Sequence, residues 1–89
     1  MEQLRVRFRE RLVAERDVLA EALGAGDREQ VRAVCHRMAG AAGMFGSPDL
    51  SALASELEAL IEDGTQGEAL SGAASALLAG IDIAIGARG

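Results

Sequence analysis

Apolar residues recur at intervals of three and four along most of the chain, which is the spacing of one face of a helix. The first such run extends from about Glu2 to Leu23, and its apolar side consists of Leu4, Phe8, Leu12, Leu19 and Leu23. Residues 4–9 also alternate between apolar and basic side chains, as a strand would. We favour a helix because no turn residue interrupts the run before Gly24.

Two further helices are predicted between Asp27 and Gly64. Asp27 and Gln30 have the spacing of a capping box, and the stripe that follows, ending near Gly46, is Val31, Val34, Cys35, Met38, Ala42 and Phe45. Ser47 and Pro48 are typical of an N-cap and a first helical residue. The third stripe is Leu50, Leu53, Leu57, Leu60 and Ile61.

A fourth helix completes the pattern. Asp63 and Gly64 end the third helix, and Thr65 with Glu68 forms a second capping box. The last stripe is Leu70, Ala73, Leu77, Ile81 and Ala84 or Ile85. Four amphipathic helices with short loops predict an all-α fold, an up-and-down antiparallel four-helix bundle, as a single domain over residues 1–89.

The composition supports closely packed helices rather than a sheet. Hydrophobic residues make up 49% of the 89 residues, but much of that share is alanine, with two Phe, no Tyr and no Trp. A chain of this length is too small for a substrate cleft between lobes. These features argue against an ordinary metabolic enzyme.

Charge, cysteine content and hydropathy bear on the partners and the location of the chain. The net charge is −5, and residues 38–89 carry one Arg against seven acids, so nucleic acid is a poor partner. The lone Cys35 has no disulfide or zinc partner, which favours a reducing, cytoplasmic location and no metal site. The start, MEQLRVRFRERL, lacks the apolar core of a signal peptide, and the apolar stretch LLAGIDIAIGA is short and contains Asp82, so we expect no membrane span.

The only histidine, His36, lies among small residues. At about 100° per residue it points away from the apolar stripe of its helix. Its neighbours one and two turns away include Ala33, Ala39, Gly40 and Gly43. Each interior Gly costs roughly 1 kcal/mol relative to Ala, so the two glycines need a reason. Either a partner approaches the imidazole closely, or the glycines admit another helix of the bundle or reflect a chain generally rich in Gly and Ala.

Accepting a phosphoryl group requires fewer further catalytic groups in this chain than the other reactions of an exposed histidine. A neutral imidazole is a nucleophile through one ring nitrogen when an acceptor holds the other. A hydrolase would need a Ser or Cys nucleophile with its own base, and none is evident beside His36. A docking partner can instead supply the acids, the metal and the cation for phosphoryl transfer.

The segment HRMAGAAGMFGSPDLSALASELE, residues 36–58, closely resembles the signature of histidine-containing phosphotransfer (HPt) domains of two-component phosphorelays. The matching residues are His36, Met38, Gly40, Ala41, Ala42, Gly46, Leu50, Leu53, Ala54 and Leu57. The resemblance implies a four-helix bundle in which His36 accepts a phosphoryl group through Nε2 and Glu58 orients the ring through Nδ1. The alternative for Glu58 is a solvated helix carboxylate.

One position departs from the family pattern, because Ala39 stands where the family usually has Lys. Arg32, Arg37 and Arg28 are nearby cations, and Arg32 is the best substitute as a phosphate or partner ligand. The alternative for all three is an ordinary charged helix face. The expected partner-binding surface around His36 consists of Arg32, Arg37, Ala39, Gly40 and Gly43.

The resemblance implies a carrier rather than an enzyme with its own small substrate. The expected partners are a response-regulator receiver domain or a hybrid histidine kinase, with no cofactor here and Mg²⁺ on the receiver. A pseudo-HPt adaptor that docks without phosphotransfer, and the HPt segment of a larger sensor histidine kinase, are the alternatives. We expect a monomer, although Val6, Val13 and Ala20 have the spacing of a dimer seam.

Overall fold

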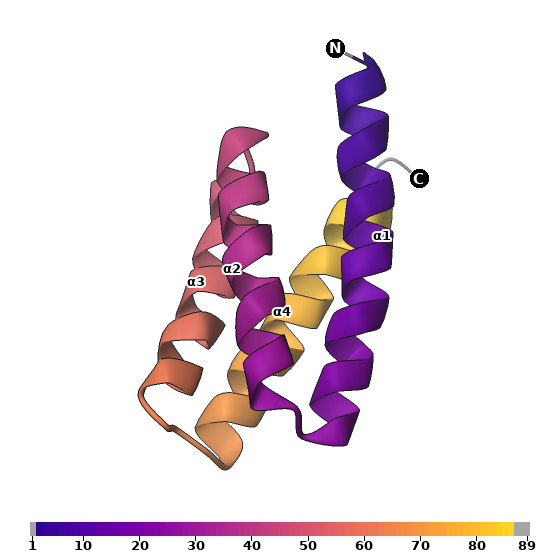
Figure 1. Ribbon diagram of the computed structural model, residues 1–89. Helices are drawn as coiled ribbons and strands as arrows, with labels where there is room; N and C mark the ends of the chain where they lie inside the picture. Colours follow the sequence, from indigo (N-terminus) through magenta and orange to yellow (C-terminus); the bar gives the residue numbers. More distant parts are fainter. Residues whose placement is uncertain (1, 87–89) are drawn as a thin grey trace.

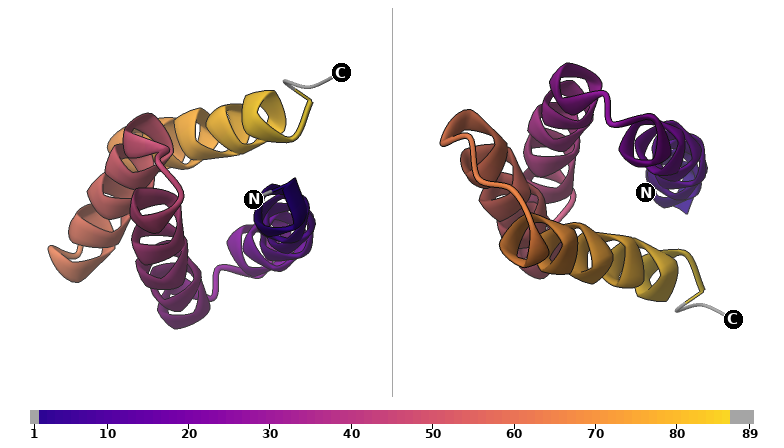
Figure 2. Two further views of the ribbon diagram at one scale, coloured as in Figure 1. Left: turned by 90° about the horizontal axis from the view of Figure 1, so that it is seen from above. Right: turned by 90° about the horizontal axis from the view of Figure 1, so that it is seen from below.

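Four helices account for most of the chain that the structure describes, residues 2–86. In this computed structural model the helices are α1 (Glu2–Ala25), α2 (Arg28–Met44), α3 (Pro48–Glu62) and α4 (Glu68–Gly86) (Figure 1). Each helix packs against the next, and α1 also contacts α4 (Figure 2). No strand occurs within residues 2–86. The predicted all-α four-helix bundle is therefore confirmed, and residues 4–9 are helical rather than extended.

The N-terminus of α2 has half of the predicted capping box, because the backbone N–H of Asp27 bonds to Ala22 O at 2.9 Å and not to the Gln30 side chain. Asp27 Oδ1 accepts a hydrogen bond from the backbone N–H of Gln30 at 3.2 Å. Gly26, just before it, has a φ of 70°, a conformation that glycine adopts without the penalty of a Cβ atom. The first helix runs to Ala25, two residues beyond its predicted end, because the chain turns at Gly26 and not at Gly24.

The caps of the other two helices differ from the prediction. Ser47 and Pro48 occupy the N-cap and first position of α3 as expected, but the Ser47 side chain makes no capping hydrogen bond. The expected Thr65 cap is wrong. The backbone N–H of Ser71 bonds to Gly67 O at 3.0 Å, so Gly67 is the residue before α4. Gly64 and Gly67 both have a positive φ, of 78° and 77°, and the loop before α4 is two residues longer than predicted.

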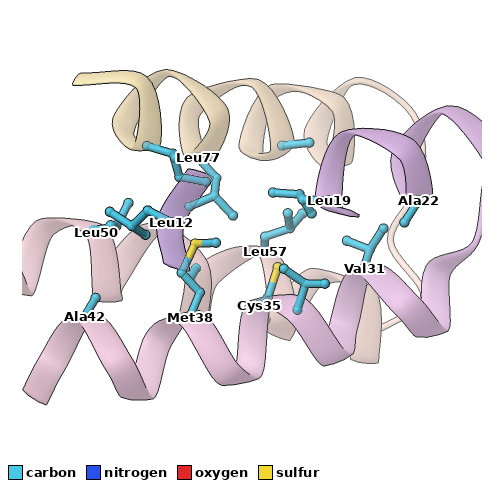
Figure 3. Close-up of a cluster of buried hydrophobic side chains, with 14 residues drawn as sticks. Leu12, Leu19, Ala22, Val31, Cys35, Met38, Ala42, Leu50, Leu57 and Leu77 are labelled. Carbon is cyan, nitrogen blue, oxygen red and sulfur yellow. The ribbon is translucent and has the colours of Figure 1, made fainter. Parts of the chain in front are cut away.

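One stripe from each helix forms the core, as Figure 3 shows. The largest fully buried side chains are Leu19, Met38, Leu57, Leu77, Ile81, Val34 and Cys35. Phe8 is half-buried, but Phe45, predicted in the apolar stripe of the second helix, is exposed (38%) because α2 ends at Met44 and Phe45 lies at its C-cap. The two rings stack with centroids 4.8 Å apart. The side chain of Leu4 lies outside the described part. Cys35 is fully buried in this core, which confirms its predicted packing role. The same burial raises the pKa of its thiol to about 12.

The fourth helix is longer than the short apolar stretch from which we expected no membrane span. By length and composition alone it could cross a membrane, since it runs without a break over Glu68–Gly86. In the structure one stripe of α4 is buried in the bundle, at Ala74, Leu77 and Ile81. On its exposed side Asp82 accepts hydrogen bonds from Arg16 of α1, the Nη2–Oδ2 distance being 3.1 Å. The helix is thus a bundle helix in this structure.

Candidate functional site

His36 stands on the outer face of α2 beside α3. Its side chain is 74% exposed, which confirms the predicted orientation away from the core. Nδ1 lies 2.9 Å from Glu58 Oε2, and the Glu58 side chain is only 17% exposed. Since a carboxylate can only accept, this contact favours the tautomer of the neutral ring in which Nδ1 carries the proton and Nε2 has the lone pair. The predicted contact between Glu58 and the ring is therefore present.

Polar contacts between α2 and α3 fix which residues face each other along their shared edge. Ser51 Oγ donates to Ala39 O at 2.9 Å, His36 meets Glu58, and Arg32 Nη1 lies 4.0 Å from Glu62 Oε2. Residue numbers fall along α2 as they rise along α3, so these two helices run antiparallel. We call this row the α2–α3 seam.

The two glycines near His36 are not required by packing within the bundle. A Cβ atom added to Gly40 would have no heavy atom within 4 Å, apart from its own helix backbone and chain neighbours. At Gly43 the nearest atom would be Ser51 Oγ at 3.7 Å, an ordinary van der Waals distance. A closely passing helix therefore does not explain either glycine. Their effect is to leave the backbone beside the imidazole open to solvent.

The three candidate arginines are placed differently. Arg37 makes two hydrogen bonds to Glu15 of α1, at 3.2 and 3.0 Å. Arg28 Nη2 donates to the carbonyls of Ile61 and Thr65 at the far end of the seam. Only Arg32 is paired along the seam next to His36, where its Nη2 lies 2.6 Å from Glu29 Oε2.

The electrostatics at Arg32 follow from that pair. The hydrogen bond and charge of Glu29 raise the pKa of Arg32, with smaller contributions from Glu62 and Glu58, and Arg32 lowers the pKa of Glu29. Both groups are thus charged at neutral pH. The Lys position of the family is filled by Ala39, whose side chain is half-buried and carries no charge.

Sequence reasoning missed two residues of this seam and the partner of Arg32 beside it. The pair of Arg32 with Glu29 was detectable, because Glu29 is three residues before Arg32 on one helix. Ser51 and Glu62 were not, because their contacts depend on the register between two helices. Within residues 2–86 no three His, Cys, Asp or Glu side chains are grouped so as to hold a metal ion. The chemistry that the described groups support is attack by Nε2 on an electrophile brought from outside.

Comparison with protein families gives a class for this bundle and its exposed histidine. The Hpt domain model matches residues 3–85, nearly the whole chain. The chain therefore belongs to the Hpt domain family, as its resemblance predicted. No curated protein and no solved structure shows a significant match. Membership implies a phosphotransfer-related role in two-component signalling, where Hpt domains interact with receiver domains and kinases.

Proposed function

We propose that this chain is a phosphorelay intermediate that accepts a phosphoryl group on His36 from a receiver-domain aspartate, or from a kinase, and passes it to a response-regulator receiver. The observation that carries the proposal is the His36–Glu58 pair on an exposed, small-residue face. The chain acts as a carrier without a small-molecule substrate or cofactor of its own. Mg²⁺ belongs to the receiver.

The proposed transfer is an in-line displacement at phosphorus. The Nε2 lone pair forms the N–P bond while the P–O bond to the donor carboxylate breaks, and that carboxylate leaves with the electron pair. The ring keeps its Nδ1 proton and becomes cationic. The Glu58 carboxylate, 2.9 Å from Nδ1, offsets this charge as it forms. Transfer to the next receiver reverses these steps.

The small residues supply access rather than chemistry. An aspartyl phosphate in a receiver lies in an acidic pocket that holds the metal, so the imidazole has to enter that pocket to attack. The small residues Ala39, Gly40 and Gly43 have no side chain long enough to block approach to the imidazole. A Cβ atom at Gly40 would lie in open space. Arg32 supplies positive charge that complements an acidic pocket. Arg37, on the same helix, is held by Glu15 of α1.

Further parts of the proposal concern the state of the chain. We take it as a cytoplasmic monomer of one domain, and the lone buried Cys35 suits a reducing compartment. The antiparallel order of α2 and α3 and the short loops support an up-and-down bundle. The exposed Val6 and Val13 of α1 are the residues to examine if a dimer forms.

A pseudo-HPt adaptor is the second candidate function, favoured by Ala39 in place of Lys. Such a chain would dock a receiver or kinase without taking the phosphoryl group. An HPt segment of a larger sensor histidine kinase would use the same site as the first proposal and differ only in its connections.

Phosphoryl transfer from a labelled receiver tests the proposal. The wild-type chain and His36→Gln are each incubated with phosphorylated receiver domains, after binding of each receiver has been measured. Acid-labile label on the wild type alone supports a carrier that uses His36. If receivers bind both proteins and label neither, the carrier proposal fails and the adaptor is favoured.

A further inference from the structure

The arginine one turn before His36 is held by two carboxylates. Arg32 Nη2 lies 2.6 Å from Glu29 Oε2 on α2, and Arg32 Nη1 lies 4.0 Å from Glu62 Oε2 on α3. Glu62 is one turn along α3 from Glu58, the partner of His36. A cation thus lies beside the histidine, but with two anions already next to it.

We propose that Glu29 and Glu62 hold Arg32 in the unphosphorylated chain and that a phosphoryl group on His36 takes Arg32 from them. This inference rests on the function proposed above and adds an exchange of ion-pair partners to it. Arg32 and His36 are four residues apart on α2, a spacing that brings side chains within contact. A phosphoryl group carries up to two negative charges and three acceptor oxygens, so it can replace both exposed carboxylates as the partner of Arg32.

The exposure of the partners explains why Arg32 is the arginine that can move. The carboxylate side chains that hold it are 78% and 55% exposed, at Glu29 and Glu62. When Arg32 leaves, water solvates both carboxylates, and little stability is lost. Glu15, which holds Arg37 by two hydrogen bonds, is only 13% exposed, so water would replace those hydrogen bonds less readily if Arg37 moved away.

Arg28 is fixed for a similar reason. Its Nη2 group donates to two partly buried backbone carbonyls, those of Ile61 and Thr65. Moving it would leave carbonyl oxygens short of a donor near the end of the bundle. Among these three arginines only Arg32 combines a position on the seam beside His36 with partners that solvent can replace.

The exchange has a thermodynamic consequence. With Ala39 in place of Lys, Arg32 is the cation that stabilises the phosphoryl group on His36, and Glu29 opposes that contact. Arg32 therefore raises the fraction of chain that carries phosphoryl at equilibrium with a receiver, and Glu29 lowers it. This fraction depends only on the free energies of the separate proteins, so it is independent of any contact that Arg32 makes with a docked receiver.

The experiment is phosphoryl exchange with one receiver, followed to equilibrium at protein concentrations below the dissociation constant of the complex. The measured quantity is the equilibrium constant for transfer onto the chain. Arg32→Gln should lower this constant by roughly threefold and Glu29→Gln should raise it by a similar factor, the range of an exposed ion pair. In the Arg32→Gln background, Glu29→Gln should change it far less.

Controls separate exchange from simple charge effects. Arg11→Gln removes the same charge from an exposed side chain on α1, which is 3.9 Å from Glu15, and Glu68→Gln removes an acid from the start of α4. Both should leave the constant unchanged. Equal effects of Arg32→Gln and Arg11→Gln would overturn the proposal. So would a Glu29→Gln effect of the same size with and without Arg32, because repulsion through space would then explain it.

The same assay distinguishes failure of the exchange from failure of the proposed function. If His36 of the wild type is labelled and Arg32→Gln does not change the equilibrium constant for transfer, the proposed exchange is wrong and the carrier function stands. If no receiver that binds the wild type labels it, the carrier function is wrong and the exchange is overturned with it.

Discussion

His36 and Glu58 are 22 residues apart in the sequence and belong to different helices, yet Nδ1 and Oε2 lie 2.9 Å apart. Their exposures are opposite, because the ring projects into solvent while 17% of the carboxylate side chain is exposed. The partly buried member is held in the seam and directs the exposed one. This arrangement fixes the tautomer of a reactive side chain without covering its other nitrogen.

Removing the Glu58 carboxylate is expected to slow phosphoryl transfer onto His36. In Glu58→Ala the ring loses its acceptor and the charge that offsets the imidazolium, so we expect a rate about tenfold lower. Glu58→Gln keeps an acceptor oxygen without the charge, so its transfer rate should lie between those of the wild type and Glu58→Ala. The measurement is the initial rate of transfer from a saturating phosphorylated receiver.

The control for this prediction is Glu56→Ala, which removes an exposed carboxylate from the same helix. It should transfer at the wild-type rate. Urea unfolding of all variants checks that the bundle is intact. Wild-type transfer by Glu58→Ala would mean that Glu58 is only a solvated helix carboxylate that happens to lie near the ring.

The features that depend on one helix were predictable from the sequence. The apolar stripes, the Asp27 cap and the outward direction of His36 each follow from periodicity or local chain chemistry. The Glu58 contact was predicted only through the family resemblance, because local periodicity does not give the register of α2 against α3. For the same reason the pairing of Arg37 with Glu15 was not foreseen.

The loop before α4 shows a local limit of such reasoning. Thr65 and Glu68 have the spacing of a capping box, but the two glycines between Asp63 and Glu68 both adopt positive φ. Those turns move the helix start away from Thr65, whose carbonyl accepts from Arg28 instead. Capping motifs are therefore less reliable where glycines give the chain other conformations at little cost.

The ion pair between α1 and α4 should make stability depend on pH. The hydrogen bond from Arg16 holds the pKa of Asp82 below its ordinary value. Because the folded pKa is lowered, the contribution of Asp82 is fully present above the unfolded pKa of about 4 and is lost as the pH falls through the folded value. Asp82→Asn should therefore be less stable than the wild type at pH 7 and nearly equal to it in strong acid.

Urea midpoints of the two proteins, compared across this pH range, check the prediction. Glu29, whose pKa Arg32 also lowers, titrates in both proteins and cancels in the comparison. A difference between wild type and Asp82→Asn that stays constant with pH would show that Asp82 acts through packing or hydrogen bonding alone. High salt should reduce the difference at pH 7, since the pair is exposed.

Gly40→Ala is expected to stabilise the fold and impair transfer at once. The added methyl group has open space around it, and Ala is favoured over Gly in a helix interior by roughly 1 kcal/mol. The same methyl group lies one turn after His36, on the surface that a receiver has to approach. We therefore expect a higher urea midpoint together with transfer slowed by at least about threefold.

Gly72→Ala is the matched control, because Gly72 is an exposed glycine inside α4 with equally open space. It should gain the same stability and transfer phosphoryl at the wild-type rate, since α4, as described over residues 68–86, contacts α1 and α3 but not α2, which carries His36. Equal transfer rates for both variants would show that the receiver does not approach over Gly40. In that case the open backbone beside His36 would need another explanation than docking.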